Sequence, residues 1–85
     1  EGAQLNGTNF GGSDLTYVSF RFASLKGASL KGAKLHNADF SKADLTGADL
    51  SGADVKDADF DGAILTDVKG LERLAGRERA RNLSQ

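Results

Sequence analysis

The segment Ala38–Phe60, ADFSKADLTGADLSGADVKDADF, repeats one five-residue unit of alanine, aspartate, a large apolar residue and two small or polar residues. The large residue recurs at every fifth position from Leu5 to Leu65, thirteen times without interruption, and a small or compact residue stands two places before each one. A fixed internal period is the primary signal of a repeat architecture. The chain is therefore built from one short unit rather than from a conventional set of helices and strands.

This period matches neither the 3.6-residue turn of an α-helix nor the two-residue alternation of a strand. No straight element can gather all of the large residues on one side, so the chain must change direction once in each unit. If each unit is a short extended segment followed by a corner, the large residue and the small residue two places earlier point to the same side. The sequence then predicts a coil with an apolar interior, whose successive turns stack at the ~4.8 Å spacing of hydrogen-bonded strands.

These A(D/N)Lxx units, which run from residue 3 to about residue 67, resemble the pentapeptide repeat family. The resemblance implies an all-β fold, a right-handed quadrilateral β-helix with four units, or twenty residues, in each coil. Thirteen units then form a solenoid of about three coils. The four sides and the handedness are implied by the resemblance, whereas the period itself indicates only a coil.

A twenty-residue coil can be tested on the sequence, because residues twenty apart should stack. Phe20, Phe40 and Phe60 fall in one interior column, and only Phe10 departs from this phenylalanine ladder. Two of the four corner columns hold glycine, which suits a turn that needs positive φ. The other two corner columns hold mostly larger residues, for which we expect a different type of turn: Tyr17, Asn37 and Asp57 in one, and Phe22, Lys42 and Gly62 in the other.

The repeat ends after Leu65, and the residues from Leu71 to Arg81 are mostly good helix formers with apolar residues at helical spacing. We therefore expect two parts, a pentapeptide-repeat β-helix over residues 1–69 and a short C-terminal α-helical cap or basic tail over residues 70–85. Repeat proteins need a cap because a terminal coil otherwise exposes its edge.

The first coil poses the same problem, because the sequence starts inside a repeat, with Ala3 and Leu5 already in register. An open coil edge invites pairing with another chain. We expect this edge to be covered by an upstream segment, by a partner protein or by a second copy in an end-to-end dimer.

The charges are unevenly distributed, although the net charge is only −1. Residues 1–69 carry seven basic and ten acidic residues, and residues 70–85 carry four arginines and two glutamates. Aspartates dominate the later coils, and such a ladder could bind a cation, imitate nucleic-acid phosphate or simply be solvated. The solvated interpretation is favoured, because charge runs are usually exposed faces and flat faces do not converge on one ion.

The segment Thr16–Phe22, TYVSFRF, departs most from the repeat. Tyr17 and Phe22 occupy outward corner positions that elsewhere hold small or polar residues, and Arg21 lies next to Phe22. Tyrosine, phenylalanine and arginine are enriched at protein interfaces, so these three residues predict a partner-binding surface. The alternative is that the two rings lie over neighbouring turns or fill the space of missing glycines.

The arginines of the tail form a second candidate surface for a partner: Arg73, Arg77, Arg79 and Arg81. On the expected helix they would point outward and could bind an acidic protein, nucleic acid or a membrane surface. The interspersed Glu72 and Glu78 favour a simpler interpretation as a soluble helix face. The apolar stripe is also too short for stable membrane insertion.

No sequence motif indicates an enzyme or a cofactor site. The chain has no cysteine, which excludes disulfides, thiolate metal sites and a thiol nucleophile. The single histidine, His36, is expected to face solvent without the nucleophile and orienting acid that a catalytic base needs. The glycines follow the repeat and form no phosphate-binding motif. We therefore predict no catalytic residues, no metal and no cofactor.

The sequence is best interpreted as a rigid display surface, although such a fold does not by itself determine a function. The first hypothesis is a non-enzymatic scaffold for a protein partner, without direct nucleic-acid binding or membrane insertion. The resemblance suggests an auxiliary or assembly subunit of a photosynthetic or other membrane-associated complex, in the thylakoid lumen, a plastid or the bacterial cytoplasm. The alternative is a DNA mimic that protects a type II topoisomerase, as some pentapeptide repeat proteins do, although a short and weakly acidic body argues against it.

Overall fold

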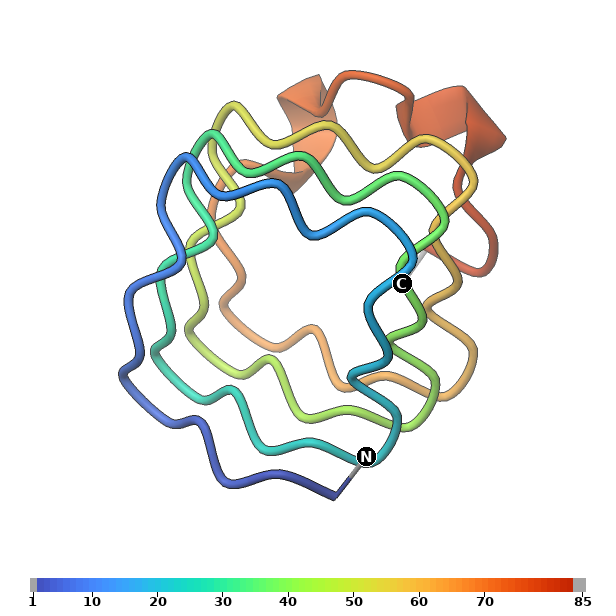
Figure 1. Cartoon of the computed structure of the whole chain (residues 1–85). Coiled ribbons are helices and arrows are strands. Elements are labelled where there is room, and N and C mark those ends of the chain that lie inside the picture. The colour runs from blue at the N-terminus through green and yellow to red at the C-terminus, as the bar shows by residue number, and fades with distance from the viewer. Residues whose placement is uncertain (1, 84–85) are drawn as a thin grey trace.

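The chain winds into a stack of four-sided coils, and Figure 1 shows them viewed along the stack. The computed structural model describes residues 2–83, apart from the side chains of Arg73 and Glu78. The first coil is blue, and the later coils follow the same outline through green and yellow to orange. The Cα atoms extend over 27 × 23 × 22 Å.

Parallel bridges hold each coil to the next. From residue 4 to residue 69 they join residues twenty places apart, so that Gln4 pairs with Ser24 and Ser24 pairs with Asp44. The backbone hydrogen bonds run along the stack: the N–H of Leu25 donates to the carbonyl of Asp44 at 2.8 Å, and the N–H of Ser24 donates to the carbonyl of Ala3 at 2.9 Å. The twenty-residue stacking predicted from the interior columns is therefore confirmed.

The interior contains the large residues and the small residues two places before them. From Ala23 to Phe60, every residue of these two sets is at most 1% exposed. The first coil is less enclosed, and Leu5, Phe10 and Leu15 are only partly buried there. Because full burial of one leucine or phenylalanine side chain stabilises a fold by ~1.5–3 kcal/mol, the repeat supplies a continuous core in spite of the small size of the chain.

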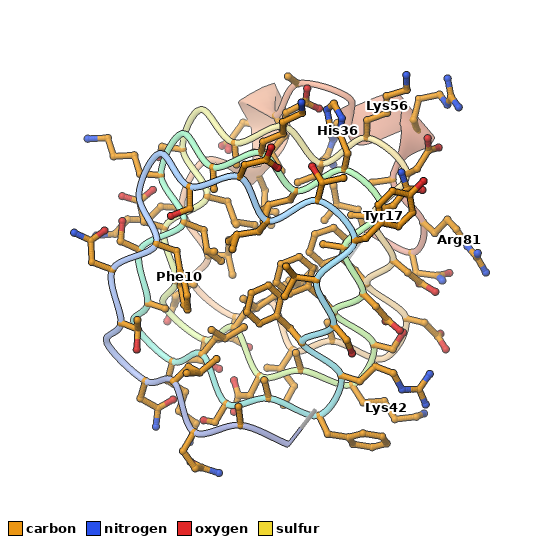
Figure 2. The ribbon with its side chains drawn as sticks, viewed as in Figure 1. Phe10, Tyr17, His36, Lys42, Lys56 and Arg81 are labelled. Atoms are coloured by element: carbon orange, nitrogen blue, oxygen red, sulfur yellow. The ribbon has the colours of Figure 1, made fainter. Side chains whose placement is uncertain are left out.

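The predicted phenylalanine ladder is present at the centre of this core. The rings of Phe20 and Phe40 are 5.0 Å apart between centroids and 10° from parallel, and those of Phe40 and Phe60 are 5.0 Å apart and 3° from parallel. Phe10, from the neighbouring column, packs its ring edge-on against Phe20 at 5.8 Å. Figure 2 shows Phe10 pointing into the coil. Each large ring therefore aligns one coil on the next.

All four corner columns use left-handed backbone, whether or not they hold glycine. Gly27 and Gly32 have φ of 66° and 69°, and Tyr17 and Phe22 have φ of 65° and 60°. The expectation of a different turn at the non-glycine corners is therefore wrong as regards φ, because every corner must redirect the chain in the same way. Glycine adopts this conformation freely, whereas another residue loses roughly 1–2 kcal/mol.

The C-terminal segment is a further stretch of coil with longer sides. The prediction of a short α-helix there is wrong. Within the described residues it contains two 3₁₀-helices, η1 (Leu71–Arg73) and η2 (Arg77–Arg79), coloured red-orange in Figure 1. Ala75 and Arg81 still form bridges to the preceding coil, at offsets of 21 and 22 residues. Each side has therefore gained one residue, which the short helix accommodates. No helix within residues 2–83 is long and apolar enough to cross a membrane.

Two glycines explain why this segment winds instead of forming an α-helix. Gly70 and Gly76 have φ of 86° and 72°. A Cβ atom at Gly76 would lie 2.7 Å from the backbone nitrogen of Lys56, and one at Gly70 would lie 2.7 Å from the Cα of Ser51. Only glycine permits such an approach in this conformation. The winding also buries Leu74 and Leu83 against the core, at 6% and 5% exposure.

Candidate protein-binding surface

The side of the first coil that runs from Tyr17 to Phe22 presents two exposed aromatic rings, and we call it the aromatic side. Tyr17 is 76% exposed and Phe22 is 50% exposed. Such exposure does not fit the alternative in which both rings lie over neighbouring turns. The two residues occupy the corners at opposite ends of the side. Figure 2 shows Tyr17 at one corner and Lys42, the residue twenty places after Phe22, at the other.

Arg21 joins Phe22 at one of these corners. Its guanidinium carbon lies 5.6 Å from the centroid of the Phe22 ring, within the range of a cation–π contact. One of its guanidinium nitrogens also lies 3.9 Å from a carboxylate oxygen of Asp39 in the next coil. The structure therefore brings together two of the three predicted residues, Arg21 and Phe22, and places Tyr17 at the separate corner of the same side.

The aromatic side combines two features that are locally unfavourable. Tyr17 and Phe22 adopt left-handed φ, which disfavours residues other than glycine, asparagine and aspartate. The Tyr17 ring is also mostly exposed, and the Phe22 ring is half-exposed. The equivalent corner positions of the next coil hold Asn37 and Lys42, with φ of 59° and 60°. Strained, exposed residues of this kind cluster at functional sites.

Three of the four tail arginines contact other groups of the protein. Arg77 donates from Nη1 to the carbonyl of Leu71 at 2.6 Å, which ties η2 to η1. Arg79 lies 3.2 Å from a carboxylate oxygen of Asp57, and Arg81 lies 3.8 Å from one of Asp59. Figure 2 shows Arg81 on the outside of the stack. The fourth predicted arginine, Arg73, has a side chain outside the described part of the structure.

A regular set of cation–aspartate pairs links successive coils. A basic residue directly follows a large interior residue and faces the aspartate eighteen places later. Lys26 approaches Asp44 at 3.8 Å, and Arg21 approaches Asp39 in the same way at 3.9 Å. Lys31 occupies the corresponding position relative to Asp49 and acts on it electrostatically. This eighteen-residue pairing was not predicted, although its spacing can be read from the sequence.

Local hydrogen bonds hold these aspartates in place. The Oδ1 atom of Asp44 accepts hydrogen bonds from the backbone N–H and the hydroxyl of Thr46, at 3.0 Å and 2.6 Å. These two bonds, and then the charge of Lys26, lower the pKa of Asp44 below its ordinary value of 3.8. At Asp39, burial opposes the shift, but the bonds from Ser41 and the charge of Arg21 still lower the pKa. Asp39 and Asp44 are therefore held in their ionised form by neighbouring donors and cations.

His36 differs from its expected state. It is partly buried, and its Nε2 atom lies 2.7 Å from Oδ2 of Asp54 in the next coil. This hydrogen bond is the largest cause of a lowered pKa at Asp54. The contact supplies the orienting acid that the sequence did not reveal, but a catalytic base also needs a nucleophile within reach. The nearby hydroxyl of Thr16 instead donates to Asp14 at 2.6 Å.

The described residues also show no grouping suited to a metal. Within residues 2–83, no three histidine, cysteine, aspartate or glutamate side chains come together as a possible set of ligands. The aspartates point outward along flat sides and make their contacts with hydroxyls, backbone N–H groups and basic side chains. The described surface carries charged side chains, hydrogen-bonding groups and two exposed aromatic rings.

Comparison with known proteins agrees with this architecture. The family model of pentapeptide repeats matches residues 1–32 and 28–67, in eight copies. The chain belongs to the pentapeptide repeat family. Proteins of this family form right-handed β-helices and are generally structural rather than catalytic. No curated protein matches this pentapeptide repeat protein.

Solved structures of other pentapeptide repeat proteins superpose on it closely. A protein from the Arabidopsis thaliana thylakoid lumen is 46% identical, with a TM-score of 0.81 over 84% of this chain and 50% of its own. One from Nostoc PCC 7120 is 43% identical, with a TM-score of 0.78 over 80% of this chain and 56% of its own. One from the cyanobacterium Cyanothece 51142 is 25% identical, with a TM-score of 0.80 over 94% of this chain and 50% of its own. The chain thus spans about half the length of these structures.

Proposed function

We propose that this pentapeptide repeat protein is a non-enzymatic scaffold whose aromatic side binds a protein partner. The observation that carries the proposal is the pair of aromatic residues, Tyr17 and Phe22, which are 76% and 50% exposed in left-handed backbone. The Tyr17 ring gains little burial to offset this conformation, and the Phe22 ring stays half-exposed. A binding role explains why such residues stand where glycine or asparagine would serve the fold better.

The dimensions of the molecule are compatible with such a role. The chain exposes 4465 Å² in total. Shared among four sides and two ends, this gives one side on the order of 700 Å², close to the ~800 Å² that each partner contributes to a standard interface. A partner that covers the aromatic side and its two corners could therefore form a specific complex without wrapping the whole solenoid.

We further propose an auxiliary or assembly role in a larger complex, including a photosynthetic or other membrane-associated one. The support is the likeness to a pentapeptide repeat protein of the thylakoid lumen, at 46% identity. DNA mimicry gains less support from the surface, because several aspartates of the ladder are paired: Asp39, Asp44, Asp57 and Asp59. Arg77, Arg79 and Arg81 also contact other groups of the chain, so the proposal rests on the aromatic side.

The proposal can be tested by affinity capture from a native extract, with the intact chain as bait. The test variant is Tyr17→Gly/Phe22→Gly, because glycine accepts the corner conformation. The matched control is Asn37→Gly, which makes the same kind of change in the Tyr17 corner column one coil further along. A partner captured by the wild type and the control, but not by the test variant, supports the proposal. Capture of a topoisomerase, or of the same proteins by all three baits, contradicts it.

A further inference from the structure

The side of the solenoid that meets the aromatic side at the Phe22 corner carries a second exposed apolar residue, Ile64. Its rows stack through the bridges of Ser24 with Asp44 and of Asp44 with Ile64, and we call it the Ile64 side. We propose that the Ile64 side binds the same side of a second copy of this chain, in an antiparallel dimer with two-fold symmetry. The proposal goes beyond the scaffold role and does not depend on it, because Ile64 lies outside the aromatic side.

The apolar groups of the Ile64 side are spread along the stack. Within residues 2–83, three large apolar side chains are exposed, and two of them lie here: Phe22 at 50% and Ile64 at 48% exposure. They are two coils apart, or ~10 Å along the stack. The row between them holds Lys42, whose aliphatic stem lies over Gly62, since a Cβ atom on Gly62 would meet Lys42 Cγ at 3.3 Å. A lysine stem adds apolar surface in this way while its ammonium group stays in water.

The fold itself does not call for an isoleucine at position 64. The other residues of this outward column are polar: Gln4, Ser24 and Asp44. Asp44 accepts a hydrogen bond from the backbone N–H of Thr46 at 3.0 Å. Isoleucine cannot accept the equivalent bond, and nearly half of its side chain meets water. Burial against a second copy would remove that apolar surface from water.

The charges of the Ile64 side change sign along the stack. The three rows that carry charges are residues 21–27, with Arg21 and Lys26, residues 41–47, with Lys42 and Asp44, and residues 61–67, with Asp61 and Asp67. Their formal charges are therefore +2, 0 and −2. Two copies facing each other in the same direction would set like charges opposite each other, whereas an antiparallel pair sets the basic row of one copy against the acidic row of the other.

A two-fold axis near Lys42 brings both kinds of contact into register. Phe22 of one copy then faces Ile64 of the other, and Lys26 faces Asp61, so that each contact occurs twice. The side chain of Lys26 is 58% exposed and lies 3.8 Å from its own Asp44, which leaves it able to approach a second carboxylate. Asp61 is exposed as well. Arg21 is already engaged by Phe22 and Asp39 and is not needed for either contact.

The size of the Ile64 side suits a specific dimer. The 4465 Å² of exposed surface, shared among four sides and two ends, gives one side on the order of 700 Å², so two facing sides would bury on the order of 1,400 Å². This area lies within the ~1,200–2,000 Å² of a standard interface. Such a dimer leaves Tyr17, at the far end of the aromatic side, exposed to another protein.

Sedimentation equilibrium of the intact chain, from about 1 μM to about 1 mM, tests the dimer. We expect a monomer–dimer equilibrium for the wild type. Ile64→Ser should weaken association at least tenfold, because it removes the apolar contact and repeats the residue found at Ser24 in the same column. The control Tyr17→Gly removes an exposed ring away from the Ile64 side and should leave the dissociation constant unchanged. Unfolding curves establish that each variant is folded.

A charge exchange tests the antiparallel register. Lys26→Glu alone sets two acidic groups against each other at each contact, and Asp61→Lys alone sets two lysines against each other, so each variant should be monomeric. An equimolar mixture of the two should dimerise again, because one contact then joins the introduced glutamate to the introduced lysine and the other joins Lys26 to Asp61. The pair of Lys26 with Asp44 within the chain is not restored in the mixture, so the recovery reports on the interface.

A wild type that stays monomeric up to about 1 mM overturns the inference. A dimer that survives Ile64→Ser, or a mixture of the charge variants that stays monomeric, overturns it as well. A monomeric chain that loses a captured protein with Ile64→Ser shows that this side binds a different protein, which also contradicts the pairing of two copies. In each of these cases, capture that depends on Tyr17 would still support the scaffold role, so the two proposals fail separately.

Discussion

Replacing Gly76 by alanine should destabilise the C-terminal coil far more than the same change at an open corner. At Gly76 the backbone has φ of 72°, and the new Cβ would lie 2.7 Å from the Lys56 backbone nitrogen and 2.8 Å from the Lys56 Cα. Left-handed backbone costs alanine ~1 kcal/mol, and the overlap with immobile backbone costs a further ~1–3 kcal/mol. We expect a total loss of about 2–4 kcal/mol in the free energy of unfolding.

The matched control for this prediction is Gly12→Ala. Gly12 has almost the same φ, 71°, but no atom lies within 4 Å of the position of its Cβ. Only the conformational cost of ~1 kcal/mol should remain there. Both variants are measured by urea unfolding, monitored by circular dichroism.

Detachment of the C-terminal coil without global unfolding would be seen in hydrogen exchange. The backbone N–H groups of Val55 and Phe60 donate to the carbonyls of Ala75 and Arg81, so Gly76→Ala should reduce their protection. Equal losses in Gly76→Ala and Gly12→Ala, with unchanged protection of Val55 and Phe60, would refute the close approach on which this reasoning rests.

Three further predictions follow from the core, the corners and the Asp ladder. Phe40→Ala should lower the free energy of unfolding by ~3–5 kcal/mol, because the Phe40 ring is fully buried between two others. Phe10→Ala should lower it less, because Phe10 is only partly buried, and equal losses in chemical denaturation would contradict the role of the phenylalanine ladder. Tyr17→Gly and Phe22→Gly should leave thermal stability unchanged or slightly higher, since each removes left-handed strain from an exposed residue; a clear loss would show that the rings are structural. The free energy of unfolding should fall as the pH drops below about 4, because the pKa values of Asp39, Asp44 and Asp54 lie below 3.8 in the fold and the unfolded chain therefore binds more protons. Asp44→Asn should make this dependence on pH less steep, and a free energy of unfolding that is constant from pH 5 to pH 2.5 would contradict the pKa shifts.

The coil and its core were predictable because one residue pattern determines both. A large residue at every fifth position leaves the chain no regular element except a turning one. The twenty-residue spacing of Phe20, Phe40 and Phe60 fixed the stacking, and the rings lie parallel at 5.0 Å as that spacing requires. The exposure of Tyr17 and Phe22 could also be predicted, because both depart from the repeat at outward corners.

Helix propensity does not predict the C-terminal coil, because backbone register decides the conformation of the tail. The tail contains a six-residue repeat, GLERLA and GRERAR, followed by Asn82. The first residue of each unit has positive φ: Gly70, Gly76 and Asn82. Helix formers in this segment lie in 3₁₀ turns because the bridges at Ala75 and Arg81 hold the chain on the coil. Tertiary pairing therefore overrides local propensity.

The surface contacts were harder to predict, because they depend on side chains from neighbouring coils. The bond between His36 and Asp54 spans eighteen residues, so it cannot be inferred until the twenty-residue coil is known. The same holds for Arg79 with Asp57, whose offset of 22 residues also depends on the longer sides of the last coil.

The scaffold role is tested most directly by the affinity of the purified protein for the partner identified by capture, measured by isothermal titration calorimetry. Wild type is compared with Tyr17→Gly/Phe22→Gly and with Asn37→Gly, after unfolding curves have shown that all three are folded. We expect the first variant to bind at least tenfold more weakly than the wild type, while Asn37→Gly binds as tightly as the wild type. Undiminished affinity in the folded Tyr17→Gly/Phe22→Gly variant would contradict the claim that the aromatic side is the binding surface.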